Sequence, residues 1–517
     1  MSVDDAIGMY ADGFESAKPS MEAQSLRSWR SYTEPRPPSQ PTNKDNVRPK
    51  VFHRRSQSAG LLDRVAKSAT GELMPPQPTP NKRTSSQIIA GSILQHSQEV
   101  RENENSQPPK AEPTPSAIPR DRYGFKKISH YVTLEKYDAW EEGYSEHIER
   151  RRKKWHALMT SYGLTTNNPL RFPPKSEKIK RYVRKGIPPE WRGNAWFWYA
   201  GGPRVLAKEA GLYQKLLDRA NEGELTANDR EHIERDLHRT FPDNIRFKPD
   251  PTVATETPGV TVIGTPTRQK ETETPMLGAL RRVLHAFAVH NPAIGYCQSL
   301  NFIAGLLLLF LDQDEEKAFI LLKIVTSLHL PGTHGVDLAG ANVDIAVLMS
   351  CIQDSMPVIW AKLDDKGGGP APFAPGSQST NLPTVSLATT AWFMSLFVGT
   401  LPMESVLRAW DCLFFEGSKT LFRVALAIFK LGERQILSVS DPMEVFQLVQ
   451  TLPKSMLDIN GLMELCFRRR GGFAHISQDL VEKRRQERRA DAKEVAATFE
   501  GRSAKWRARL RGKTRIL

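Results

Sequence analysis

The chain has 517 residues, of which 25% are charged and 39% hydrophobic. These ordinary values exclude a wholly disordered or fibrous chain. Its four cysteines lie far apart and form no CxxC pair, which excludes a disulfide-rich secreted scaffold and a zinc finger with paired cysteines. Most of the net charge of +14 comes from residues 468–517, which carry +10. The nearly neutral remainder is unlike a nucleic-acid enzyme with a basic channel.

Residues 1–118 are predicted to be disordered. They are rich in Pro and Ser and show no sustained apolar period, so they cannot bury enough surface to offset the entropy lost on ordering. The first residues are acidic and no apolar segment follows, so no export signal is expected. The longest apolar run, Phe302 to Leu311, has half the length of a membrane span, which needs about 20 residues.

Residues 119–184 are predicted to form a helical N-terminal extension. Tyr137, Trp140, Tyr144 and Ile148 recur at helical spacing within a pattern that runs over residues 134–162. The charge run at residues 150–154 lies on this helix and is interpreted as a solvated face.

Helical patterns continue almost without a break over residues 185–470, and no alternating pattern indicates a strand, so the predicted fold class is all-α. Pro188-Pro189 opens a helix that ends at Gly201-Gly202. Asn291-Pro292 is expected to cap a helix that runs to Leu311. Further helices are predicted over residues 276–290, 315–328, 343–363, 384–397, 403–415, 420–431, 441–449 and 456–468.

Two stretches interrupt the helical patterns and are interpreted as flexible inserts. Residues 248–275 are rich in Thr and Pro, and residues 364–379 are rich in Gly and Pro. The chain closes with a basic helical tail, residues 471–517, with a helix predicted over 478–499 and basic residues around Trp506. Such a segment suits an anionic membrane surface, and a merely solvated tail is an equal alternative.

Several familiar catalytic patterns are absent from the sequence. It contains no HExxH and no GxSxG, and no histidine pairs with a cysteine at a metal-binding spacing. Gly512-Lys513-Thr514 is similar to the end of a P-loop, but Arg507 stands where the first glycine of that loop is required.

Three polar segments remain, at residues 186–196, 233–242 and 296–305. They contain in order the patterns RxxxW (Arg192 and Trp196), IxxDxxR (Ile233, Asp236 and Arg239) and YxQ (Tyr296 and Gln298). Each pattern alone is weak. The ordered set within an all-helical region is specific, and with it the chain resembles the TBC domain of Rab GTPase-activating proteins over residues 185–470.

The region ahead of this domain, Tyr123 through Trp155, is similar to that of fungal members linked to polarised secretion. The resemblance implies a multi-helix TBC domain that accelerates GTP hydrolysis by a Rab-family small GTPase in its GTP form, in vesicle trafficking or exocytosis. It implies a cytoplasmic location, with peripheral binding at membranes or at sites of polarised growth.

The resemblance also assigns roles to residues. Arg239 would be an arginine finger, and Gln298 would supply in trans a glutamine that orients the attacking water. A guanidinium stays charged, and an amide can donate and accept at once, so both side chains suit these tasks. Asp236 would hold local geometry, and Tyr296 would position its segment. Arg192 and Trp196 are expected to be scaffold.

No cofactor of the chain itself is expected, because Mg²⁺ and GTP would belong to the partner GTPase. The first alternative is a catalytically silent Rab-binding scaffold, since an ordered insert shortly after Arg239 would block the finger. The second is a nucleic-acid binder acting through the basic tail. This is disfavoured because Trp506 is the only aromatic residue among the basic residues there.

Overall fold

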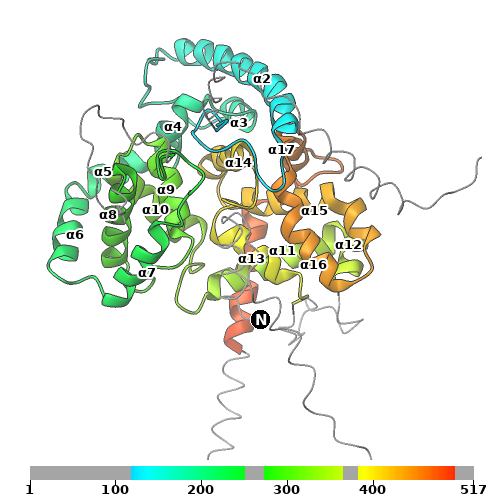
Figure 1. Cartoon of the computed structure of the whole chain (residues 1–517). Coiled ribbons are helices and arrows are strands. Elements are labelled where there is room, and N and C mark those ends of the chain that lie inside the picture. Colours follow the sequence, from blue (N-terminus) through cyan, green and yellow to red (C-terminus); the bar gives the residue numbers. More distant parts are fainter. Residues whose placement is uncertain (1–117, 251–272, 365–381, 495–517) are drawn as a thin grey trace, which may run out of the picture. The chain divides into compact units, whose positions relative to one another are not determined.

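The computed structural model describes residues 118–250, 273–364 and 382–494 (Figure 1). Apart from Ile118, the region predicted to be disordered lies outside the described residues. So do most of both predicted inserts and the basic segment around Trp506. Within the described ranges the chain is helical, and β-structure is limited to isolated bridges. The all-α prediction is confirmed.

The helices fall into three sets separated by the two gaps. Before the first gap lie α2 (Leu134–Ser161), α3 (Glu177–Arg184), the 3-10 turn η3 (Pro189–Trp191), α4 (Arg192–Tyr199), α5 (Gly202–Lys208), α6 (Leu212–Asn221) and α7 (Ala227–Leu237). Between the gaps lie α8 (Pro275–His290), α9 (Leu300–Phe310), α10 (Glu315–Ile324), the π-helical turn η5 (Val325–His329), α11 (Ala339–Ser355) and α12 (Pro357–Leu363). The third set is α13 (Ser386–Met394), α14 (Met403–Glu416), α15 (Lys419–Ser438), α16 (Pro442–Thr451), η6 (Leu452–Ser455), α17 (Ile459–Phe467) and a last helix at residues 478–494.

Two helices organise the packing. Helix α8 contacts α6, α7, α9 and α10, which Figure 1 shows grouped with it in green. Helix α14 contacts α3, α4, α15 and α17, and so joins the early helices to the late ones. Ten of the eleven residues of α9 are buried, as expected for a helix that is apolar on every side.

The helix predicted from Asn291-Pro292 to Leu311 is wrong in its first half. Asn291 ends α8, and α9 begins only at Leu300. Between them the backbone turns through Gly295, whose φ is +58°, and Ser299, whose φ is +94°. The YxQ pattern therefore lies on an irregular turn rather than on a helix.

Other boundaries also differ from the predictions, among them the end of the helix predicted over 420–431, which runs on to Ser438, and two whose cause is local. The helix expected over 343–363 begins earlier, at Ala339, and is broken at Pro357, because proline removes a backbone donor from the helix. The insert expected to end at residue 275 ends sooner. Thr274 caps α8 by accepting a hydrogen bond from the Leu277 amide, and Pro275 is the first residue of that helix.

Both flanking regions pack into the same core. In the N-terminal extension, the fully buried Trp155 donates from Nε1 to the Gly186 carbonyl at 2.8 Å. In the region predicted as a basic tail, Arg485 is fully buried and its Nε lies 2.7 Å from Asp344 Oδ1. The first half of the predicted tail is thus part of the fold. Among the described helices, none combines the length and the apolarity that crossing a membrane demands.

Candidate functional site

The IxxDxxR pattern spans the end of α7 and the turn that follows it. Thr226 caps the helix by accepting from the Asp229 amide at 3.0 Å, and Ile233 and Leu237 face the core. Asp236, between them, is therefore buried as well. The helix ends at Leu237, so Arg239 lies in the turn beyond it, with its amide 3.2 Å from the Asp236 carbonyl.

Asp236 connects two of the three patterns. Its carboxylate pairs with Arg239 Nη2, and its second oxygen accepts from the Tyr296 hydroxyl at 2.7 Å. Burial, and then the Asp236 carboxylate, raise the pKa of Tyr296 well above its usual range, so this hydroxyl remains a donor. These contacts join the end of α7 to the Gln298 turn, and the role of Asp236 in holding local geometry stays a prediction.

Among the residues that the structure describes, Arg239 is held from one side. Its side chain is 34% exposed, whereas that of Asp236 is 3% exposed. Within the described residues Asp236 is the one carboxylate that pairs with this guanidinium, leaving Nε and Nη1 for an acceptor from outside. A guanidinium fixed in this way is oriented before any partner arrives.

Gln298 lies in the turn between α8 and α9, which is anchored on both sides of it. The Tyr296 amide donates to Asp229 Oδ1 at 2.8 Å, and Ser299 Oγ donates to the Met394 carbonyl at 2.9 Å. Ser299 also holds the left-handed backbone conformation noted above, and such non-glycine outliers persist only where neighbouring contacts impose them. Gln298 itself is partly exposed.

Asn301 ties the two segments together a second time. Its Nδ2 lies 2.9 Å from Thr240 Oγ1 and 3.4 Å from the Asp236 carbonyl, and its Oδ1 accepts from the Ser299 amide at 3.2 Å. No role was predicted for Asn301. The available signal was an amide one residue into a run of apolar residues, because a buried amide requires partners.

The N-terminal extension braces the stretch after Arg239. The Lys126 amide donates to the Asp243 carbonyl at 3.1 Å, and the Phe125 ring meets the Phe241 ring edge to face at 5.4 Å. Asn244 Nδ2 donates to the Tyr123 carbonyl at 3.0 Å. The extension is therefore part of the site's support.

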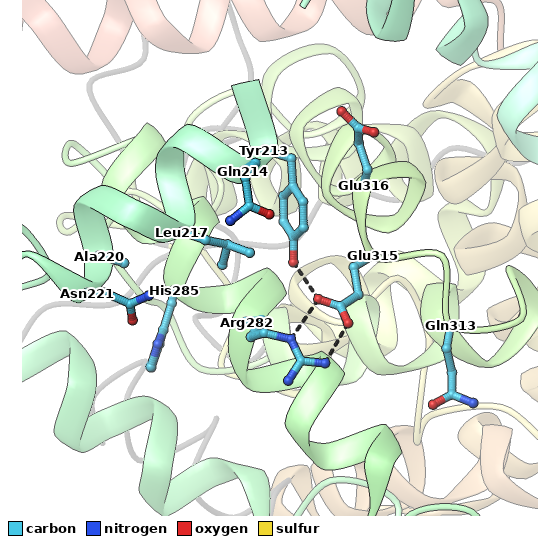
Figure 2. A pocket seen from close by; sticks show the side chains of 10 residues that line it. All are labelled: Tyr213, Gln214, Leu217, Ala220, Asn221, Arg282, His285, Gln313, Glu315 and Glu316. Atoms are coloured by element: carbon cyan, nitrogen blue, oxygen red, sulfur yellow. Dashed lines mark hydrogen bonds and ion pairs between the residues drawn. The ribbon is translucent and has the colours of Figure 1, made fainter. Parts of the chain in front are cut away.

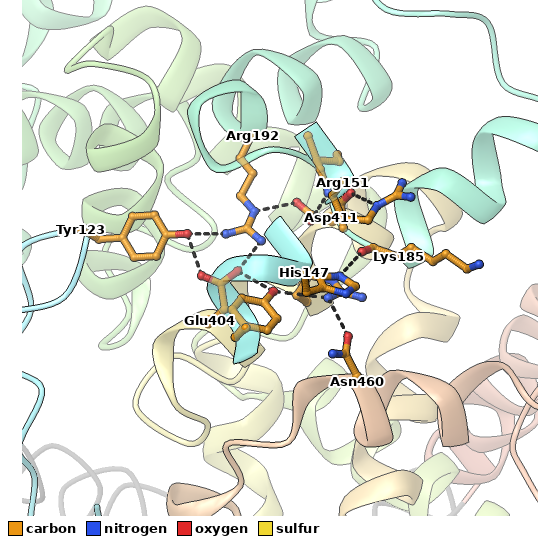
Figure 3. A network of polar contacts seen from close by, with 12 residues as sticks. Tyr123, His147, Arg151, Lys185, Arg192, Glu404, Asp411 and Asn460 are labelled. Carbon is orange, nitrogen blue, oxygen red and sulfur yellow. Dashed lines mark hydrogen bonds and ion pairs between the residues drawn. The ribbon is translucent and has the colours of Figure 1, made fainter. Parts of the chain in front are cut away.

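Arg192 and Trp196 belong to a different, buried network, drawn in part in Figure 3. Arg192 is 1% exposed; its Nη2 lies 2.6 Å from Glu404 Oε1, and its Nη1 lies 2.7 Å from the Tyr123 hydroxyl. Trp196 Nε1 donates to Asp411 Oδ1 at 2.8 Å. Burial works against the charge, but Glu404 and other neighbours outweigh it and raise the pKa of Arg192 well above its usual range. These contacts suit the scaffold role predicted for both residues.

A cavity of about 540 Å³ opens between α6, α8 and α10 (Figure 2). Arg282 and Glu315 pair within it: Arg282 Nη2 lies 2.6 Å from Glu315 Oε1, and the Tyr213 hydroxyl donates to Glu315 Oε2 at 2.8 Å. The cavity is lined by two carboxylates, Glu315 and Glu316, and by one arginine, so the charge of its lining does not suit a phosphate group. No group of His, Cys, Asp and Glu side chains in the described ranges is arranged to hold a metal ion.

Comparison with known proteins identifies the family. Residues 262–437 match the Rab-GTPase-TBC domain. The chain is 41% identical over 415 residues to "GTPase-activating protein GYP3" of Saccharomyces cerevisiae, covering 71% of this chain and 63% of that protein. It is 38% identical over 412 residues to "GTPase-activating protein MSB4" of the same yeast, covering 71% of this chain and 80% of that protein. The chain belongs to the Rab-GTPase-TBC domain family.

A solved TBC domain agrees with this assignment. The structure described as the Chlamydomonas flagellar RabGAP TBC domain is 27% identical and aligns over 68% of this chain and 100% of that one, with a TM-score of 0.51. The stretch of this chain that matches the Rab-GTPase-TBC domain, residues 262–437, contains Gln298 but begins after Arg239. The segment that carries Arg239 lies outside this match. It is joined to the matched part by the contacts of Asp236 with Tyr296 and of Thr240 with Asn301.

Proposed function

We propose that the chain is a GTPase-activating protein for a Rab-family small GTPase in its GTP form. The observation that carries this proposal is the clamp through Asp236. One buried carboxylate fixes the half-exposed Arg239 and also the tyrosine of the Gln298 turn. Membership of the Rab-GTPase-TBC domain family, and yeast relatives named GTPase-activating proteins, support the class of partner.

Arg239 acts as the arginine finger in this proposal. Hydrolysis of GTP develops negative charge on the transferred phosphoryl group, and a cation supplied in trans stabilises that charge by about 10³ to 10⁵ in rate. This corresponds to roughly 4 to 7 kcal/mol of transition-state stabilisation. Because Asp236 occupies one face of the guanidinium, Nε and Nη1 are the donors presented to the partner.

Gln298 orients the attacking water in the same proposal. Its amide donates and accepts at once, which positioning of a water molecule requires. The anchors at Tyr296 and Ser299 hold the backbone on each side of it, so little motion is lost when a partner binds. Mg²⁺ and GTP arrive with the GTPase, and the chain contributes side chains alone.

We place this activity in vesicle trafficking and exocytosis, at membranes or sites of polarised growth. This setting follows from the resemblance of the Tyr123 to Trp155 region to fungal proteins of polarised secretion. It is tested by the identity of the GTPases that respond, because exocytic Rab proteins should rank above endocytic ones in the same panel.

The deciding experiment is single-turnover GTP hydrolysis across a panel of purified, GTP-loaded Rab proteins. Wild type is compared with Arg239→Ala, Gln298→Ala and the control Arg235→Ala. Arg235 is an exposed arginine of α7 at an unspecified position of IxxDxxR, and its Nε lies 4.0 Å from Asp236 Oδ1. We expect strong acceleration of a few Rab proteins by wild type and by the control, with large losses for the other two variants.

The opposite result would point to the silent scaffold. In that case wild type binds GTP-loaded Rab proteins in a pull-down, yet hydrolysis stays at the intrinsic rate and the three variants match wild type.

A further inference from the structure

The loop at residues 330–338, between η5 and α11, presents an exposed valine. Val336 is 90% exposed, more than any other large hydrophobic residue among those that the structure describes. Single apolar side chains on a surface are common and need no explanation. Val336 differs from such residues because its loop lies next to the Gln298 turn and is fixed by contacts on both sides.

The loop lies against the Gln298 turn. The His334 Nε2 is 2.9 Å from the Met394 carbonyl oxygen, the same oxygen that accepts from Ser299 Oγ. Leu338 and Cys297 both pack against Ala341 and Met394. Both neighbours of Gln298 in the chain therefore contact the same buried residue, Met394, as the loop does, so the loop and the Gln298 turn lie side by side.

Contacts on both sides fix the loop. At its base the Gly340 amide donates to the Gly332 carbonyl at 3.1 Å, and a Cβ added at Gly340 would lie 2.3 Å from the Gly332 carbonyl carbon. The last helix, residues 478–494, fixes the start of the loop. Arg485 Nη2 donates to the His329 carbonyl at 3.1 Å, and Arg489 Nη2 donates to the Pro331 carbonyl at 3.4 Å. A surface fixed in advance loses little entropy on binding.

We infer that this loop is the rim of the partner-binding surface beside Gln298, and that Val336 makes an apolar contact with the protein surface of the GTPase. The inference rests on the proposed function and deepens it. A valine offers no donor to phosphate, and the exposed carboxylate of Asp337 beside it repels nucleotide and anionic lipid. The occupant is therefore a protein surface next to the nucleotide.

The test uses the full chain and a GTPase that wild type accelerates. Val336→Asp is compared with Val358→Asp, which changes a valine of α12 that is 59% exposed. Loss of one buried valine contact corresponds to about a tenfold to hundredfold loss of affinity. We expect Val336→Asp to raise KM by about this factor with kcat near wild type, because the contact is equal in ground and transition states. Val358→Asp and Val336→Leu should keep the wild-type KM.

Each other outcome overturns the inference. Equal KM values for Val336→Asp and Val358→Asp would show that no partner contacts the loop, while leaving the proposed function intact. A lower kcat at unchanged KM would mean that the loop only shapes the Gln298 turn. If wild type accelerates no GTPase, the proposed function fails and the inference falls with it. Thermal melting of each variant identifies any loss that comes from unfolding.

Discussion

Two groups in this protein are built from an arginine, a carboxylate and a tyrosine, and they differ in exposure. In the first, Arg192 is 1% exposed and both of its terminal nitrogens donate within the protein, to Glu404 and Tyr123. In the second, the Arg239 side chain is 34% exposed and pairs with a carboxylate that Tyr296 shares. The same chemistry is thus enclosed in one place and open in the other.

The difference separates stability from function. An arginine enclosed by acceptors has no terminal donor left for another molecule, and removing it would leave a buried carboxylate unpaired. An arginine held from one side keeps donors available while its direction is fixed. Both partner carboxylates are buried, so the exposure of the arginine itself, rather than the type of side chain, decides which role each arginine can take.

The largest effect is expected for Arg239→Ala. The rate of stimulated hydrolysis should fall by about 10³- to 10⁵-fold, because the cation for the developing charge is lost. The free energy of unfolding should change by only about 1 kcal/mol, since the pair is partly solvated and Tyr296 still donates to Asp236. Single-turnover hydrolysis and urea unfolding of the same preparation measure both. A normal rate with a large loss of stability would break the comparison.

Arg192→Met should show the reverse pattern. It leaves the buried Glu404 without its cation, which costs about 3 to 5 kcal/mol of unfolding free energy. The rate per folded molecule should stay within a few fold of wild type. Urea unfolding compares it with the double variant Arg192→Met/Glu404→Gln, which removes the unpaired charge at Glu404 but not at Asp411, and should recover part of the loss. Unchanged stability with a collapsed rate would instead place Arg192 in the catalytic group.

Gln298→Ala tests the second group, the one around Arg239. We expect the rate of stimulated hydrolysis to fall by about 10²- to 10³-fold, as when one positioned polar group is removed from a transition state. Stability should hold, because the anchors of the turn are Tyr296 and Ser299.

Tyr296→Phe is the contrasting variant. It removes a donor from the buried Asp236, so it should cost about 1 to 3 kcal/mol of stability. Equal stability of both variants would contradict this division.

Much of the fold follows from local pattern in the sequence. Thr274-Pro275 and the apolar stripe after it favour a helix start, and α8 begins there, although that pair was assigned to the insert. The predictions were wrong where contacts between distant residues outweighed the local pattern. Asn291-Pro292 has the form of a helix start, yet the next residues are held as a turn by Asp229, which is 67 positions away from Tyr296.

The site was predictable in its motif residues and not in its supports. Arg239, Asp236, Tyr296 and Gln298 follow from a recognisable order of patterns. Asn301 and the brace at Phe125 depend on which distant segments meet, and one sequence does not determine that. The basic run that includes Arg485 carried the opposite signal. Its charge indicated solvent, but Arg485 is fully buried and pairs with the carboxylates of Asp344 and Glu482.

The smallest expected effect concerns pH and separates the arginine groups from buried histidines. Burial lowers the pKa of His329 and of His334 to about 4, against about 6.5 in an unfolded chain. Between pH 6.5 and 4 the unfolded chain therefore binds protons that the folded chain does not, so stability is lost as the pH falls. Each histidine should contribute about 1 to 2 kcal/mol of this loss between pH 7 and pH 5.

Arginines keep their charge throughout this range, so the two arginines themselves do not account for that loss. Urea unfolding at pH 7 and pH 5 should show a smaller difference for His334→Gln than for wild type. The control His238→Gln changes an exposed histidine beside Arg239. If His334→Gln retains the full difference, the buried histidine does not cause it. The pH dependence would then have to come from other groups of the chain.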